Sequence, residues 1–218
     1  MLLPIKIDLH VHTCYSHDCS TTIKELFLNA KKNGLDGFAV TDHNTIKGAL
    51  RAVQEKNDNL LVIPGIEVSS AQGHILGINI KTHIPQGLRI EETVEKIHEA
   101  GGIAVAAHPS AIYKNSLGLF GNLSSYGFDA VEVLNSQAFP FFLLKYLNKR
   151  FAEQASLPQT GGSDSHLPET IGLAYTIIYV DENHCNIEEI IKAIKNNMTA
   201  PFGKATPWRL RLRKTLQG

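Results

Sequence analysis

The chain has 218 residues, of which 43% are hydrophobic, so it can bury the core of one large domain. It carries 21 basic and 21 acidic residues, and this balance argues against general binding to nucleic acid or to membrane surfaces. The first residues lack the pattern of a signal peptide, and no apolar run has the length of a transmembrane helix. We therefore expect a cytoplasmic protein with no membrane partner.

In chain order, short apolar runs alternate with amphipathic segments of helical period. The predicted strands span 5–11, 36–42, 60–70, 74–79, 103–108, 129–135, 159–166 and 173–180. The predicted helices span 21–34, 46–58, 89–102, 141–156 and 186–197. This alternation indicates βαβ units and a mainly parallel sheet, either an α/β barrel or a doubly wound sheet. The C-terminal segment 204–218 is short, basic and poorly periodic.

Three cysteines, an odd number without a Cys-x-x-Cys pair, indicate a reducing compartment. Cys14 and Cys19 flank a histidine cluster near the start of the chain. We predict that both are small buried thiols, and the alternative is that they contact a metal ion.

Polar side chains gather where the predicted strands end. They are Asp8, His10, His12, Asp42, His43, Glu67, His74, His108, Glu132, Asn135, Asp164 and His166. Active sites of parallel α/β folds lie at this edge, so these residues are expected to converge on one rim. Residues i and i+2 of a strand share a face, so His10 and His12 can bind one ion together. We expect Asp8 and Asp42 to hydrogen-bond ligand histidines, with direct metal binding by Asp8 as the alternative.

The number and type of these donors predict a multinuclear metal site. About nine candidates carry nitrogen or oxygen donors: His10, His12, Asp18, His43, Glu67, His74, His108, Asp164 and His166. A structural zinc ion takes four ligands and closes its shell, so this set indicates two or three ions with open positions. Imidazole and carboxylate together suit Zn, Mn or Fe, and clustered divalent ions suit phosphoryl transfer.

Five motifs, in this order, resemble the PHP (polymerase and histidinol phosphatase) family. They are DLHVHT at 8–13, TDHN at 41–44, GIEVS at 65–69, AAHP at 106–109 and GGSDSH at 161–166. The resemblance covers residues 8 to about 172. It implies one domain over 1–218, a distorted (β/α)7 barrel with its core at 5–172 and a short C-terminal extension at 173–218. It also implies a stand-alone phosphoesterase with a trinuclear site of Zn, Mn or Fe.

The resemblance implies a set of ligand residues for each of the three ions. The first ion takes His10, His12, Glu67 and Asp164, which form the catalytic centre. Glu67 bridges to a second ion, which is also held by His74 and His108. The third ion takes His43, His166 and Asp18, with His17 as the alternative to Asp18. The resemblance also implies that a hydroxide activated by these ions would attack phosphorus in line with the leaving oxygen.

We predict a metal-dependent phosphoesterase that hydrolyses a small phosphomonoester, either a metabolite or a nucleotide. The alternative is a metal-dependent exonuclease acting on RNA or DNA ends, whose backbone the tail residues Arg209, Arg211, Arg213 and Lys214 would hold. Nucleic acid is not the favoured partner, because the tail is better explained as a solvated edge strand or a helix covering the barrel bottom.

Two further alternatives are disfavoured by the residues themselves. A non-enzymatic binding protein of the same fold can lose its metal ligands, whereas the set is complete here. An amidohydrolase-type barrel also begins with His-x-His, but it usually carries a metal-bridging lysine on a middle strand, and no strand end here offers one.

Overall fold

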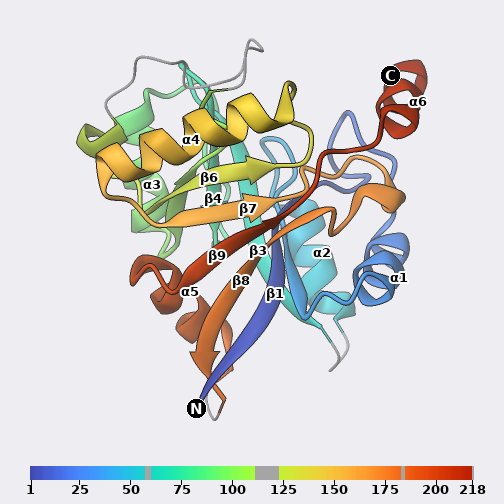
Figure 1. Cartoon of the computed structure of the whole chain (residues 1–218), viewed down its shortest axis with the longest axis horizontal. Coiled ribbons are helices and arrows are strands. Elements are labelled where there is room, and N and C mark those ends of the chain that lie inside the picture. The colour runs from blue at the N-terminus through green and yellow to red at the C-terminus, as the bar shows by residue number, and fades with distance from the viewer. Residues whose placement is uncertain (57–59, 111–122, 183–184, 218) are drawn as a thin grey trace.

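The computed structural model describes residues 1–56, 60–110, 123–182 and 185–217, which form nine strands and six α-helices (Figure 1). The strands are β1 (Leu2–Val11), β2 (Gly37–Val40), β3 (Leu61–Ser69), β4 (His74–Ile78), β5 (Ile103–Ala106), β6 (Ala130–Asn135), β7 (Gln159–Gly162), β8 (Ala174–Asp181) and β9 (Thr199–Gly203). The helices are α1 (Ile23–Lys32), α2 (Lys47–Glu55), α3 (Ile90–Glu99), α4 (Phe141–Ala155), α5 (Ile187–Lys195) and α6 (Trp208–Gln217), with 3-10 turns η1 (Leu123–Ser125) and η2 (Pro168–Thr170).

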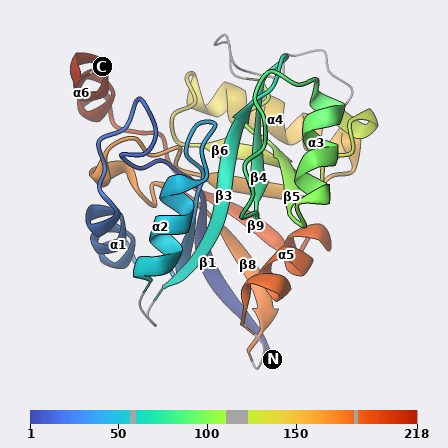
Figure 2. The same cartoon turned by 180° about the vertical axis from the view of Figure 1, so that it is seen from behind.

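The strands form one sheet in the order β7-β6-β5-β4-β3-β2-β1-β8-β9, and this sheet curls back on itself. Its two edge strands lie side by side (Figure 1), where the Thr199 hydroxyl donates to the Gln159 carbonyl at 2.8 Å. The segment after β7 also meets β1 directly, because the Asp164 amide donates to the His10 carbonyl at 2.8 Å. The sheet is therefore a nearly closed, distorted barrel with helices around it (Figure 2), which confirms the predicted fold.

The prediction of a mainly parallel sheet was wrong, because four of the eight pairings between these strands are antiparallel. Parallel pairing joins β1 to β2, β2 to β3, β5 to β6 and β6 to β7. Strand β4 runs antiparallel to both β3 and β5, since the short turn after β3 leaves no room for a crossover connection. Strands β8 and β9 are antiparallel to their neighbours as well, and β9 was not predicted.

Apolar side chains cover both faces of the barrel wall. One cluster packs α1, α2, α3 and α4 against the sheet through residues such as Leu26, Ala49 and Ile97. A second cluster joins strand residues such as Ile7 and Ile63 to Ile190 of α5. Because β8 is antiparallel to β1, α5 follows at the amino end of β1 and leaves the carboxyl end to polar groups. Among the described helices, none is long and apolar enough to span a membrane.

The C-terminal segment is a helix, α6, and it lies at a different end of the barrel from the one predicted. Arg211 donates to the carbonyls of Ser136, Gln137 and Ala138, which directly follow β6. The helix therefore sits beside the carboxyl ends of the strands, not on the barrel bottom. Alternating Arg and Leu from 209 to 213 resemble a strand pattern, and the anchoring of Arg211 on these carbonyls overrides that local preference.

The Asp8 side chain connects β1 to the segments after β7 by accepting hydrogen bonds from backbone amides. Its buried carboxylate accepts from the amides of Ser163 and Gly172, both at 2.9 Å, and of His10 at 3.3 Å. Burial raises the pKa of Asp8 to about 6, and these donors partly oppose that rise. The prediction that Asp8 bonds to a ligand imidazole or a metal ion was wrong. The pairing register shifts between Asp8 and Val11, so strict alternation does not hold there.

We predict that Asp8→Ala lowers the free energy of unfolding by roughly 2–4 kcal/mol, because buried amides lose their acceptor. Urea unfolding followed by circular dichroism measures the loss. The matched control is Asp36→Ala, since the carboxylate of the exposed Asp36 accepts only from the Lys6 amide, at 2.8 Å, among the hydrogen bonds described. The control should cost less than about 1 kcal/mol. Equal losses in the two variants would show that Asp8 has no special structural role.

Candidate metal centre

The structure brings all nine predicted donors together at the carboxyl end of the barrel. They form four overlapping groups, and within each group one donor atom per residue lies within 4.8 Å of the others. The groups are His12, Asp18, His43 and His166; His10, His12 and Glu67; His10, His108 and Asp164; and His43, Glu67 and His74. The sharing of members between groups is what a site for several adjacent ions requires.

Glu67 of β3 is the centre of this arrangement, and it is only 1% exposed. Its Oε1 lies 2.8 Å from His74 Nδ1 and 3.1 Å from His108 Nε2. Its Oε2 lies 3.1 to 3.3 Å from nitrogens of three more imidazoles, those of His10, His12 and His43. The two oxygens of one carboxylate thus face different sets of nitrogens, which is the geometry of a bridging ligand.

The first proposed ligand set has the spacing of a coordination shell. His10 Nε2 and His12 Nε2 are 3.2 Å apart, and Asp164 Oδ1 lies 3.6 and 3.3 Å from them. Glu67 Oε2 completes the set at 3.3 and 3.2 Å from the two imidazoles. Donors at tetrahedral corners, 2.0–2.2 Å from a zinc ion, lie roughly 3.4 Å apart, so the observed separations fit one ion.

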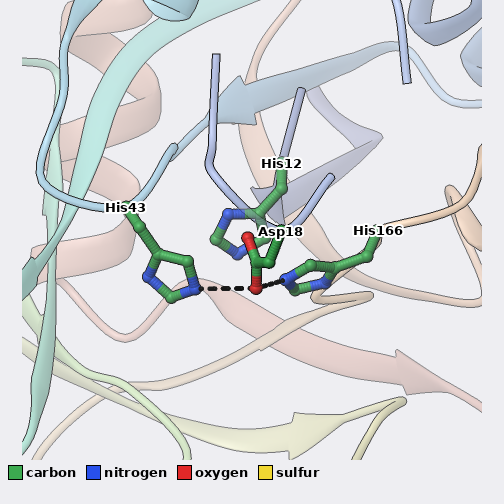
Figure 3. Close-up of side chains that lie close together, drawn as sticks. All are labelled: His12, Asp18, His43 and His166. Atoms are coloured by element: carbon green, nitrogen blue, oxygen red, sulfur yellow. Dashed lines mark hydrogen bonds and ion pairs between the residues drawn. The ribbon is translucent and has the colours of Figure 1, made fainter. Parts of the chain in front are cut away.

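Asp18 lies at the opening of the site, between two imidazoles (Figure 3). Its Oδ2 is 2.8 Å from His166 Nε2 and 3.5 Å from His43 Nε2, with His12 behind them. His17, the alternative to Asp18, is exposed, and its ring centroid lies 5.4 Å from that of His43. Of the two neighbours, Asp18 is therefore the one within reach of an ion shared with His43 and His166.

The carboxylates and imidazoles shift one another's pKa values strongly. Burial alone would raise the pKa of Glu67, but the surrounding His10, His74 and His43 hold it well below its usual range. Burial likewise opposes protonation of His12, yet Asp164 and Glu67 raise its pKa to about 9. The cluster is therefore an environment that attracts positive charge, and protons and metal ions compete for it.

The backbone is shaped to aim these side chains. His108 and Asp164 have φ values of 30° and 51°, a left-handed region that costs a non-glycine residue energy. Gly162 precedes Asp164 at a place where a Cβ atom would collide with His10 Cβ and come within 2.9 Å of Glu132 Oε1. Only glycine allows β7 to approach β1 this closely, so the GGSDSH motif serves packing as well as supplying two of the predicted donors.

Glu132 is the supporting residue to which the sequence pattern assigned no role. It is 1% exposed on β6, and its Oε1 accepts from His10 Nδ1 at 2.9 Å. Its Oε2 accepts from the His108 amide and from Asn135 Nδ2, both at 3.0 Å. A carboxylate that accepts from Nδ1 leaves the Nε2 lone pair of His10 free to bind a metal ion.

Two expectations about nearby residues were wrong. Asp42 accepts from the backbone amide of Thr13 at 2.6 Å and from its hydroxyl at 2.8 Å, so its hydrogen bonds hold a loop and not an imidazole. Cys14 is exposed and Cys19 is partly exposed, so neither is a fully buried thiol. Neither cysteine belongs to the donor groups found in the described part of the chain, and Cys19 Sγ donates to the His166 carbonyl.

The residues present fit a cluster of divalent ions. Among the described side chains, three buried atoms lack a hydrogen-bond partner: Thr21 Oγ1, Glu67 Oε2 and His108 Nδ1. Buried polar atoms are almost always paired, and two of these three belong to residues of the donor groups, which is consistent with a missing ligand there. Mixed imidazole and carboxylate donors without thiolates suit Zn, Mn or Fe. The fold and this donor set together define a metal-dependent hydrolase built on a distorted α/β barrel.

The chain belongs to the PHP domain family, which matches residues 8–201. It is 37% identical over 143 residues to the uncharacterized protein MJ1587 of Methanocaldococcus jannaschii, covering 61% of this chain and 82% of that protein. It is 36% identical over 86 residues to phosphoribosyl 1,2-cyclic phosphate 1,2-diphosphodiesterase of Eggerthella lenta, which covers 36% of this chain and 32% of that enzyme.

Two solved structures share the fold. A two-domain protein from Bacteroides vulgatus, described as containing a predicted PHP-like metal-dependent phosphoesterase, superposes with a TM-score of 0.76 at 17% identity, covering 99% of this chain and 70% of that one. The lesion-specific endonuclease PfuEndoQ from Pyrococcus furiosus superposes with a TM-score of 0.67 at 19% identity, covering 89% and 56%. At these identities the likeness concerns the fold.

We predict that Glu132→Gln weakens metal binding by about 10- to 100-fold, because an amide cannot accept from all three donors that Glu132 faces. Calorimetric titration of the metal-free protein with Mn²⁺ measures the change in Kd. Glu99→Gln is the control, since Glu99 is 62% exposed on α3 and pairs with Lys96. A Glu132→Gln protein with lowered thermal stability and an unchanged Kd would contradict the positioning role.

Proposed function

We propose that this protein hydrolyses a phosphomonoester of a small metabolite or a nucleotide, using three divalent metal ions. The observation that carries the proposal is the convergence of nine donors around the buried Glu67 carboxylate. A structural site would need four ligands and would close around one ion. The overlapping groups here offer donors to several ions in one pocket, which is the arrangement that phosphoryl transfer uses.

Each proposed ion has a set of ligands in the chain, and Glu67 belongs to two of the three sets. His10, His12, Glu67 and Asp164 would hold the first; Glu67, His74 and His108 the second; and Asp18, His43 and His166 the third. When bound, such ions polarise phosphoryl oxygens, lower the pKa of water and stabilise the leaving oxygen. Zn, Mn and Fe all match these donors.

The protein's own groups keep this constellation in place. Glu132 fixes the ring of His10, and it also accepts from the His108 amide. Asn135 Nδ2 donates to Asp164 Oδ2 at 3.2 Å, which orients the second carboxylate of the first set. His10 and His12 are fully buried whereas Asp18 is exposed, so the substrate would enter from the side of Asp18. Deep ligands and an exposed edge give a dry centre that a phosphoryl group can still reach.

A second candidate function is hydrolysis at the end of a nucleic acid. The observation that favours it is the position of α6, whose basic residues lie beside the carboxyl ends of the strands and not at the opposite end. The Pyrococcus structure with the same fold is an endonuclease, and the Eggerthella relative is a diphosphodiesterase. Both names are compatible with a phosphodiester as substrate on this framework.

We predict that His10→Ala and Asp164→Ala each lower metal-dependent kcat/KM by more than about 100-fold, since each removes a proposed ligand. Phosphate release from phosphomonoesters, mononucleotides and short oligonucleotides, with and without Mn²⁺, measures the loss. His98→Ala is the control, because His98 is 40% exposed on α3 and pairs with Asp129. Folded ligand variants that keep full Mn²⁺-dependent turnover would sink the proposal.

A further inference from the structure

An exposed aromatic groove lies between α6 and the start of α4. It has a volume of about 410 Å³ and is lined by Phe139, Phe142, Leu143, Pro207, Trp208 and Arg211, among others. Phe142 is 83% exposed, Trp208 63% and Phe139 43%. Contiguous apolar patches of this kind on a protein surface commonly mark a binding site.

Contacts within the groove connect Phe139, Trp208 and Arg211 to one another. The Phe139 and Trp208 rings meet edge to face, with their centroids 5.0 Å apart. The guanidinium of Arg211 lies 6.0 Å from each ring centroid and donates to four backbone carbonyls, those of Ser136, Gln137, Ala138 and Thr206. Side chains held in this way lose less conformational entropy when a flat ligand stacks on them.

A basic hollow of about 590 Å³ is also lined by α6 and the segment before it. Lys204, Arg209 and Arg213 contribute cations to it, and Glu169 contributes a carboxylate that pairs with Arg213. Lys204 and Arg209 are both exposed. The aromatic groove and the basic hollow lie on different sides of α6 and share Pro207, just before the helix, in their linings. A ligand that crosses the start of α6 could therefore place flat rings in one and phosphates in the other.

Hydrogen bonds connect this surface to the metal centre through one chain segment. Asn135 donates to the carboxylate of Asp164, and the next residue, Ser136, accepts from Arg211. The Ser136 hydroxyl also donates to the carbonyl of Ser163, the residue before Asp164. One chain segment therefore contacts both the proposed ligand Asp164 and the anchor of α6.

We propose that the aromatic groove and the basic hollow bind single-stranded nucleic acid and lead its end to the metal centre. Bases would stack on Trp208 and Phe142, while backbone phosphates would lie at Lys204 and Arg209. A duplex hides the faces of its bases, so a single strand is the form that suits the groove. The inference rests on the second candidate function, hydrolysis at the end of a nucleic acid, because the bound strand would be the phosphoester substrate.

Trp208 is the chain's single tryptophan, so its fluorescence reports directly on the groove. The metal-free full-length protein is titrated with a twelve-residue single strand, with an abasic strand of equal length and with a duplex. We expect saturable quenching by the single strand, with much weaker quenching by the abasic strand and by the duplex. Phe142→Ala should raise Kd about tenfold, which corresponds to the stacking of one base. Arg209→Gln should reduce the salt dependence of binding by about one phosphate contact.

Phe202→Ala is the matched control, because Phe202 is 59% exposed and packs on Tyr175 of β8, away from the groove. Its affinity should equal that of the unsubstituted protein. Absent quenching, or equal quenching by the abasic strand, would overturn the inference. The inference would also be overturned if sedimentation showed a dimer of the chain whose interface covers Trp208. Because no turnover is needed, a lack of phosphoesterase activity would count against the proposed function and not against this binding surface.

Discussion

The buried carboxylate of Glu67 is the constraint on which the site depends. A charged group with 1% exposure is costly unless opposite charge surrounds it, and five imidazoles lie within 3.3 Å of its two oxygens. Those imidazoles come from β1 and the residue after it, from β4, and from the segments that follow β2 and β5. Neutralising one carboxylate therefore requires strand ends from around the barrel to meet, and cations complete the arrangement.

The irregular features of the barrel serve the same convergence. Antiparallel β4 begins at His74, so this imidazole reaches the rim from a strand that runs opposite to its neighbours. The left-handed backbone at His108 and Asp164 turns two strand ends inward, and Gly162 lets β7 lie against His10. Strained backbone positions such as these lower the free energy of unfolding, and they are common in preorganised sites.

The sequence alone predicted which residues meet, because several histidines and carboxylates gathered at strand ends are costly to bury without a cation. It did not predict the supporting contacts. Asp8 is the first residue of the DLHVHT motif, whereas Glu132 lies outside all five motifs. Only the register shift in β1 and the proximity of β6 decide that Glu132 is the carboxylate that contacts the His10 ring. The direction of β4 depended on a turn that is too short for a crossover connection. The position of α6 depended on the hydrogen bonds of Arg211 to a distant part of the chain. Such contacts join residues far apart in the chain, where local patterns carry no signal.

The most direct test of this account is the number of metal ions bound per chain, measured by elemental analysis after equilibrium dialysis against Mn²⁺, for the unsubstituted protein and for Glu67→Gln. Glu67 belongs to two of the four donor groups and lies beside His108, whereas Asp18, His43 and His166 form a group without it. We expect three bound ions per chain in the unsubstituted protein and one in the folded Glu67→Gln variant. Equal occupancy in the two proteins would contradict the bridging role of Glu67 and the trinuclear centre built on it.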